Sequence, residues 1–118
     1  MYYWGMKKII FATLLSVLPV VANAYVEKAN AVIRILNKDA GKVVERTVPV
    51  GQNIKFEKLN IKIRNCKQSD PFDAEDYFVF IEIFDDEDQV FGGWMTRNEP
   101  GQNPLQHSDY DVWLVKCN

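Results

Sequence analysis

Histidine and cysteine, which hold most protein-bound metals and supply many nucleophiles, are scarce in this chain of 118 residues. The chain contains one histidine, His107, and two cysteines, Cys66 and Cys117. Two cysteines with one histidine are too few for a typical zinc site, and the cysteines lack the C-x-x-C spacing of a redox pair. The sequence also has no nucleophile elbow, internal repeat or low-complexity segment. It therefore indicates no metal site, no cofactor and no catalytic residue.

Charged residues are absent from Ile9–Ala22, a run of 14 residues that follows two lysines. The small-residue site Ala22-Asn23-Ala24 comes next, so a positive flank, an apolar run and a cleavage site occur in the order of a secretory signal peptide. A membrane-spanning helix needs about 20 apolar residues, and this run is shorter. Residues 1–24 are therefore predicted to form a signal-peptide helix that is cleaved between Ala24 and Tyr25. An uncleaved N-terminal anchor is the minor alternative.

Such a signal indicates a protein of the periplasm of a Gram-negative bacterium, or a secreted one. Either Met1 or Met6 can serve as its start. Residues 25–118 then form a single small domain that does not span the membrane.

Acidic side chains outnumber basic ones after residue 24. The chain has 14 basic and 16 acidic residues, of which residues 1–24 hold two basic and no acidic ones, so 12 and 16 remain and the net charge is −4. Nucleic acids and anionic membrane surfaces attract basic proteins. Neither is expected as the main partner of this domain.

Both cysteines lie after the predicted cleavage site. An even number of cysteines in an exported protein indicates a disulfide, so Cys66 is predicted to pair with Cys117. The bridge would close a loop of about 50 residues, for which chain entropy gives about 4 kcal/mol of stabilisation. A redox-active or metal-binding pair is the alternative.

Short runs of β-branched and aromatic residues alternate with turn residues along the whole of residues 25–118, which predicts an all-β fold. We expect a small antiparallel β-sandwich or a partly open barrel of about seven strands. Gly41, in the first turn, is expected to have a positive φ. The predicted strands are 31–36, 43–48, 53–57, 59–66, 77–84, 90–96 and 110–117.

Three details of these strands bear on the site. Cys66 falls on the outward phase of its alternating strand, so either a bulge near Asn65 turns it or the bridge lies on the face opposite the core. Gly92 and Gly93 indicate a bulge or a close backbone approach. Segments 77–84 and 110–117 are apolar on both faces, which predicts two central strands covered on both sides. The residues expected on their second faces are Phe78, Phe80, Trp113 and Val115.

His107 lies in a long loop, 97–109, close in sequence to Asp109 and Asp111. A hydrolytic group built on these three residues is conceivable, but neighbours in sequence rarely form such a group. We expect instead that His107 hydrogen-bonds to backbone and fixes the loop. The acidic runs 85–88 and 70–76 lack the spacing of a calcium loop and are predicted to be solvated turns.

Aromatic residues crowd the C-terminal quarter of the chain, where Trp94, Tyr110 and Trp113 flank the long loop. Exposed tryptophan and tyrosine bind sugars and proteins through rigid, amphipathic rings. They also fill the cores of β-sandwiches. The sequence leaves both interpretations open.

The C-terminal strings FGGWM at 91–95, NPLQH at 103–107 and YDVWLVKC at 110–117 resemble the DUF2155 family of uncharacterised exported alphaproteobacterial proteins. Upstream strings LNKDAG at 36–41 and VPVG at 48–51 agree, so the resemblance covers nearly all of residues 25–118. Ser108 stands where members commonly have proline. The resemblance implies an exported domain with these boundaries, and no activity.

We therefore expect a non-enzymatic binding or accessory module that engages an envelope protein or a peptidoglycan-like glycan. A small envelope hydrolase using His107 with Asp109 or Asp111 is the alternative. The loop is expected to be ordered by Asn103, Leu105 and His107 against strand 110–117, or to cover a sheet edge. The candidate binding surface comprises Trp94, Asn103, His107, Tyr110, Asp111 and Trp113.

Overall fold

The computed structural model describes residues 25–118, which form an all-β domain. The predicted signal-peptide helix lies outside the described residues. Within them there is no helix, and hence no helix long and apolar enough to cross a membrane. The strands are β2 (Val26–Glu27), β3 (Asn30–Asn37), β4 (Lys42–Pro49), β5 (Asn53–Phe56), β6 (Leu59–Gln68), β7 (Tyr77–Asp85), β8 (Asp88–Thr96) and β9 (Tyr110–Cys117).

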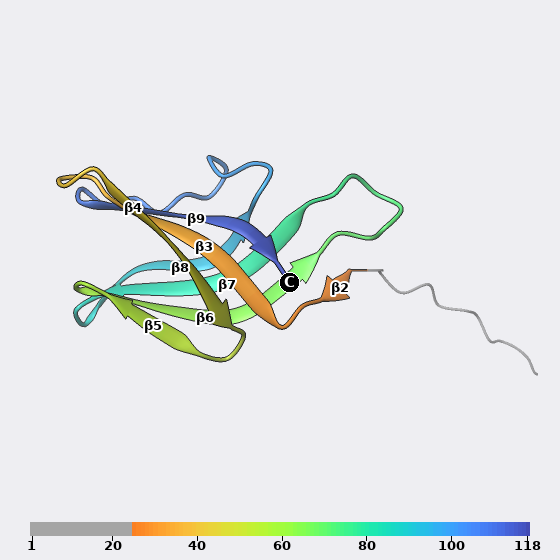
Figure 1. The fold of residues 1–118 in the computed structure, drawn as a ribbon, viewed down its shortest axis with the longest axis horizontal. Helices are drawn as coiled ribbons and strands as arrows, with labels where there is room; N and C mark the ends of the chain where they lie inside the picture. Colours follow the sequence, from red (N-terminus) through yellow and green to blue (C-terminus); the bar gives the residue numbers. More distant parts are fainter. Residues whose placement is uncertain (1–24) are drawn as a thin grey trace, which may run out of the picture.

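The strands form two antiparallel sheets that pack face to face (Figure 1). The five-stranded sheet has the order β2-β6-β7-β8, with β5 also paired to β6, and the three-stranded sheet has the order β4-β3-β9. The prediction of a small antiparallel sandwich is confirmed, and the sheets do not close into a barrel. All seven predicted strands are present, and the short β2 is additional.

The core lies between the sheets and follows the alternation of each strand. Alternate residues of β6 and β7 are completely buried, whereas the residues between them face outward and are partly or fully exposed. Burying apolar side chains on one face of each sheet stabilises this two-layer arrangement. The largest completely buried aliphatic side chains are those of Ile33, Ile35, Leu59, Ile61, Ile63, Ile81 and Ile83.

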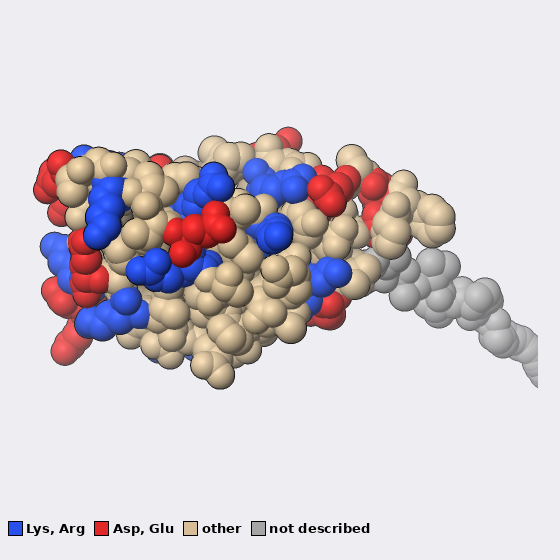
Figure 2. Space-filling model, in the orientation of Figure 1, with Lys and Arg blue, Asp and Glu red and all other residues tan. Residues whose placement is uncertain are grey.

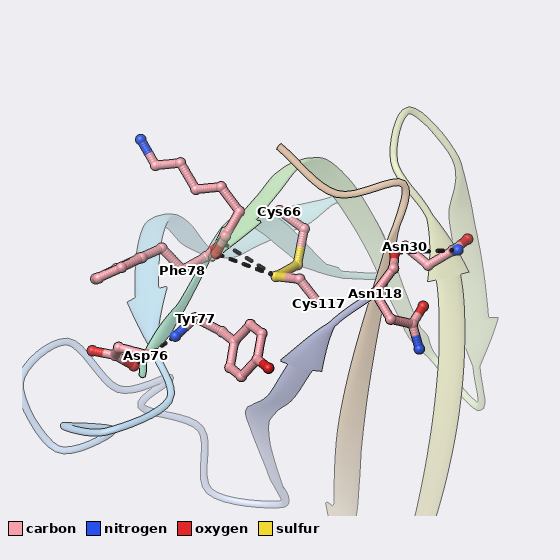
Figure 3. The surroundings of a disulfide bond; sticks show 8 residues. Asn30, Cys66, Asp76, Tyr77, Phe78, Cys117 and Asn118 are labelled. Atoms are coloured by element: carbon pink, nitrogen blue, oxygen red, sulfur yellow. Dashed lines mark hydrogen bonds between the residues drawn. A yellow bond between two sulfur atoms is a disulfide. The ribbon is translucent and has the colours of Figure 1, made fainter. Parts of the chain in front are cut away.

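A β-bulge at Arg64 brings Cys66 to the core. The register of β6 against β7 shifts between Ile63 and Asn65, and Cys66 is completely buried. The predicted bulge near Asn65 is therefore confirmed, as is the disulfide to Cys117, whose Cα lies 5.7 Å from that of Cys66. The bridge joins the two sheets beside the last residue of the chain (Figure 3).

Three hairpin turns gather at the end of the sandwich opposite β2 (Figure 1), here called the hairpin end. The β3–β4 turn contains Gly41 at φ 65°, as predicted. The acidic β7–β8 turn is confirmed as a two-residue hairpin turn between Asp85 and Asp88, with Asp86 at φ 53°. Basic and acidic side chains lie interleaved on the face seen in Figure 2 and gather at this end.

The bulge in β8 occurs at Val90, where the register against β7 shifts, rather than at the two glycines. The close backbone approach, which was the other predicted outcome, is not found either, because the atoms nearest Gly92 and Gly93 belong to side chains. A Cβ on Gly92 would lie 2.5 Å from Nε2 of Gln89, and Gly93 has φ 150° with Asn103 beside it.

The prediction of two central strands was right for β7 and wrong for β9. β7 lies between β6 and β8, but β9 is paired only with β3 and forms an edge of its sheet. The outward side chains of both strands, Phe78, Phe80, Trp113 and Val115, are partly exposed rather than covered. Apolar residues on a second face therefore mark a partly solvated outer surface in this protein, not another buried layer.

Candidate functional site

The six residues of the predicted binding surface lie in three separate places. Trp94 is on the outer face of β8, where the backbone oxygen of Trp94 accepts a hydrogen bond from Asn103. His107 and Tyr110 are buried together at the hairpin end. Asp111 and Trp113 line a pocket beside β9. The structure thus brings these residues together in pairs and not as one continuous surface.

Residues 97–109 run from the end of β8 back along the molecule to the start of β9 (Figure 1). Nδ2 of Asn103 donates to the backbone oxygen of Trp94 at 3.0 Å, and Leu105 is buried in the core. Nε2 of His107 lies 2.8 Å from Oδ2 of Asp85 at the end of β7. The expectation that these side chains order the loop against β9 was therefore wrong for Asn103, which bonds to β8. His107 bonds to Asp85 of β7 and also packs edge-on against Tyr110 of β9.

Both ring nitrogens of His107 are engaged. Nδ1 accepts a hydrogen bond from the backbone N–H of Asp109 at 2.9 Å, so Nε2 carries the proton that is donated to Asp85. Its backbone oxygen accepts a hydrogen bond from Nζ of Lys38 at 2.9 Å. The prediction that His107 bonds to backbone and fixes the loop is confirmed. No observation on residues 25–118 favours the hydrolase alternative, because neither nitrogen is available to activate a nucleophile.

Tyr110 closes the hairpin end beside His107, with ring centroids 5.2 Å apart. Its hydroxyl donates to Oε1 of Glu57 at 2.7 Å, and Nδ2 of Asn37 donates to the same oxygen at 2.9 Å. The hydrogen bond to Glu57, together with burial and the nearby carboxylates, raises the pKa of Tyr110 to about 12. Glu57 and Asp85 were missed from the sequence because each belongs to a turn that topology, and not proximity in the chain, places here.

A pocket of about 390 Å³ opens between the loop and β9. Asp111 is its only ionisable side chain and has no ion-pair partner among residues 25–118. The half-buried indole of Trp113 and two proline rings supply apolar surface. The arrangement suits a ligand that presents an apolar ring or chain next to a hydrogen-bond donor. The lining residues are Pro100, Gly101, Pro104, Asp111, Val112 and Trp113.

The outer face of the five-stranded sheet carries a second group, which we call the aromatic platform: Tyr25, Lys67, Phe78, Phe80 and Trp94. Tyr25 and Trp94 are 44% and 43% exposed. The ring of Trp94 lies 5.3 Å from that of Phe80, and the ring of Tyr25 lies edge-on to Phe78 at 5.5 Å. Lys67 extends between them, with Nζ 4.4 Å from the Tyr25 centroid and 4.8 Å from that of Trp94.

The acidic segment 70–76 is a solvated turn at Asp73 and Glu75, as the sequence predicted, but Asp76 is partly buried and hydrogen-bonded. Asp76 accepts hydrogen bonds from the backbone of Tyr77 and Asn98 and from the hydroxyl of Thr96, at 2.7–3.0 Å. Glu75 accepts a hydrogen bond from Nη1 of Arg97 at 3.2 Å. These carboxylates join the β6–β7 loop to the start of loop 97–109. Within the part of the chain that the structure describes, no three histidine, cysteine or acidic residues are placed to hold a metal ion.

The fold and its sites define a small β-sandwich whose sheets are joined by a disulfide and whose edges are bridged by an ordered loop. Residues 31–117 match the family described as uncharacterized proteins conserved in bacteria (DUF2155), and the chain belongs to that family. The family resemblance found in the sequence is thereby confirmed. No curated protein and no solved structure shows a significant match to the chain.

Proposed function

We propose that this protein is an exported, non-enzymatic binding module of the cell envelope. Its binding site is the pocket between loop 97–109 and β9, and its partner is an envelope protein or glycan. The observation that carries the proposal is the pocket itself, which combines an indole, two proline rings and one unpaired carboxylate. Such concave, largely apolar sites with a few polar groups are the usual form of ligand sites.

The anchoring of the loop supports this assignment. A binding site needs walls that keep their shape, because ordering a loose loop at the moment of binding costs free energy. Asn103 and Leu105 hold the middle of the loop, and His107 holds its end, on either side of the pocket-lining Pro104. The loop is therefore preorganised over the pocket.

Export is supported by the signal-peptide pattern and by the disulfide, since disulfides persist mainly in oxidising compartments. Cleavage before Tyr25 would leave the folded domain complete. Tyr25 itself packs on Phe78, and β2 begins at the next residue.

A photo-crosslinking residue in place of Gly101 tests the proposal in intact cells. A side chain added at Gly101 meets no atom within 4 Å, so the substitution should not disturb the fold. The matched control places the same residue at Val43, which is 51% exposed on β4. We expect a light-dependent adduct with one envelope component from position 101 and none from position 43. Adding Trp113→Ala should abolish that adduct while preserving the disulfide and cooperative unfolding.

A glycan partner is tested by co-sedimentation of the purified protein with insoluble envelope glycan, again comparing wild type with Trp113→Ala. The proposal fails if position 101 gives no adduct and sedimentation is absent. It also fails if adducts and sedimentation persist unchanged in folded Trp113→Ala protein, because binding would then not use the pocket.

A further inference from the structure

Many outward side chains of the five-stranded sheet are basic or aromatic. Their outward direction follows from the strand alternation, since the residues between them are the buried ones. Four basic and two acidic side chains give this face a net charge of +2, whereas residues 25–118 as a whole carry −4. The basic residues are Lys55, Lys62, Arg64 and Lys67, the acidic residues are Glu27 and Glu82, and the aromatic residues are Tyr25, Phe78, Phe80, Phe84 and Trp94.

Two of the three lysines of this face, Lys62 and Lys67, are held by aromatic rings rather than by carboxylates. Nζ of Lys67 lies over the rings of Tyr25 and Trp94, and Nζ of Lys62 lies 5.1 Å from the Phe84 centroid. Neither lysine has a carboxylate within 4.0 Å among residues 25–118. A cation–π contact positions an ammonium group but does not neutralise its charge. Of the basic residues on this face, Arg64 alone is paired, with Glu82 at 2.8 Å.

The platform spans two neighbouring rows of the sheet. The rings of Phe80 and Trp94 are inclined by 34° and lie side by side in one row, whereas Tyr25 stands edge-on to Phe78 at 80°. Lys67 and Phe78 are directly paired in the next row. Adjacent strands lie about 4.8 Å apart, which places a charged group about one strand spacing from each exposed ring.

A ligand complementary to this face has an apolar ring face and an anionic group at the ring edge. We propose that the aromatic platform, with the basic residues around it, binds a carboxylate-bearing glycan. The C–H face of each sugar packs on Trp94 or Tyr25, and the sugar carboxylate binds the ammonium group of Lys67. This site lies apart from the Trp113 pocket and does not depend on the function proposed for it.

The charge distribution favours a glycan over nucleic acid. Duplex nucleic acid carries a charge about every 1.7 Å of its length, and a domain of net charge −4 repels so dense a polyanion. A carboxylated glycan has a lower charge density and can align one carboxylate with one local cation. An exposed row of rings on the outer face of the sheet also suits an extended polymer that lies along it.

Titration of the purified domain with oligogalacturonate, followed by calorimetry, tests the proposal. Its fully methyl-esterified form is the matched control, because it keeps the sugar rings and removes the charge. We expect saturable binding of the acid that the ester weakens about tenfold or more. Lys67→Met, which keeps the apolar stem, and Trp94→Ala should each weaken binding by a similar factor. Arg34→Gln, an exposed basic residue on the opposite sheet, should leave binding unchanged.

Tryptophan fluorescence in a Trp113→Phe background reports on Trp94 separately, and circular dichroism confirms that each variant remains folded. Absence of binding, or equal binding by folded Lys67→Met, overturns the proposal. Equal binding of the ester rules out recognition of the carboxylate. Tighter binding of poly-L-glutamate or single-stranded DNA, with the same dependence on Lys67 and Trp94, would instead identify an acidic protein or nucleic-acid surface.

Discussion

At the scale of single residues, the hairpin end depends on the hydroxyl of Tyr110. This buried group donates to Glu57, whose carboxylate also accepts from Asn37, so one acidic side chain joins the β3–β4 turn, the β5–β6 turn and the start of β9. Hydrogen bonds to charged acceptors stabilise more than neutral ones do, and an unsatisfied buried group is costly. Removing the hydroxyl oxygen of Tyr110 alone should therefore destabilise the hairpin end.

Tyr110→Phe should lower the free energy of unfolding by about 1.5 kcal/mol at neutral pH. It should also change the alkaline limb of the stability curve. The pKa of Tyr110 is about 12 in the folded protein and 10.0 ordinarily, so the unfolded chain loses this proton first. The stabilisation that comes from protonated Tyr110 is fully present below pH 10 and is lost as the pH rises toward about 12. Urea denaturation between pH 8 and about 12 should show a shallower fall in the variant.

Tyr77→Phe is the matched control, because Tyr77 donates at 3.2 Å to a largely exposed carboxylate, Glu75. At neutral pH, Tyr77→Phe should lower the free energy of unfolding less than Tyr110→Phe does. An unchanged alkaline fall in Tyr110→Phe would show that Tyr110 is not the group that couples stability to high pH.

Asn65 carries a buried side-chain oxygen, Oδ1, with no hydrogen-bond partner among the described residues. It lies in β6 directly after the bulge and opposite Phe80. Asn65→Val removes this unsatisfied acceptor and introduces a β-branched residue that strands favour, so the free energy of unfolding should rise by about 1 kcal/mol. Thermal and urea denaturation would measure the gain. A loss of stability instead would mean that the amide has a structural role through its nitrogen.

At the scale of elements, strand alternation was sufficient to predict every long strand and the inward set of β6 and β7. It could not decide the phase of Cys66, because a bulge such as that at Arg64 inserts one residue without a distinctive residue type. It also misassigned β9, since a strand apolar on both faces has the same sequence at an edge as at the centre. The sequence grouped Trp94 and Trp113 in one candidate surface, but the two residues lie in different sheets. Which sheet a strand joins depends on pairing with distant parts of the chain, and strand alternation does not reveal that pairing.

His107 determines whether loop 97–109 stays attached to the hairpin end. His107→Ala removes the bonds to Asp85 and to the backbone of Asp109 and opens a cavity beside Tyr110. We expect a loss of about 2 kcal/mol in unfolding free energy and faster hydrogen exchange at Leu105–Asp109. Asn103→Ala removes one exposed hydrogen bond and should cost less than about 1 kcal/mol. Equal effects of the two substitutions would contradict an anchoring role specific to His107.

At the scale of the whole molecule, the two sheets are fastened at both ends by different means. The hairpin end uses the polar contacts of His107 and Tyr110, and the opposite end uses the disulfide between Cys66 and Cys117. The polar contacts and the disulfide therefore join the sheets at opposite ends of the molecule. The platform lies on the outside of one sheet and the pocket at the edge of the other, so the relative position of the two sites depends on how rigidly the sheets are joined.

Removing the disulfide should loosen this arrangement without changing either site directly. Cys66 and Cys117 are 51 residues apart, for which chain entropy gives a stabilisation of about 4 kcal/mol. A domain of this size is usually stable by about 5–15 kcal/mol, so the loss is a large fraction of the total. The Cys66→Ala, Cys117→Ala double variant should therefore unfold at a much lower urea concentration, with a larger m-value because its unfolded chain is less compact. Wild type under reducing conditions should match it, and the variant itself should not respond to reductant. If wild type and the double variant unfold together in oxidising buffer, the polar contacts of the hairpin end suffice to hold the sheets, and the stability of the domain does not depend on an oxidising compartment.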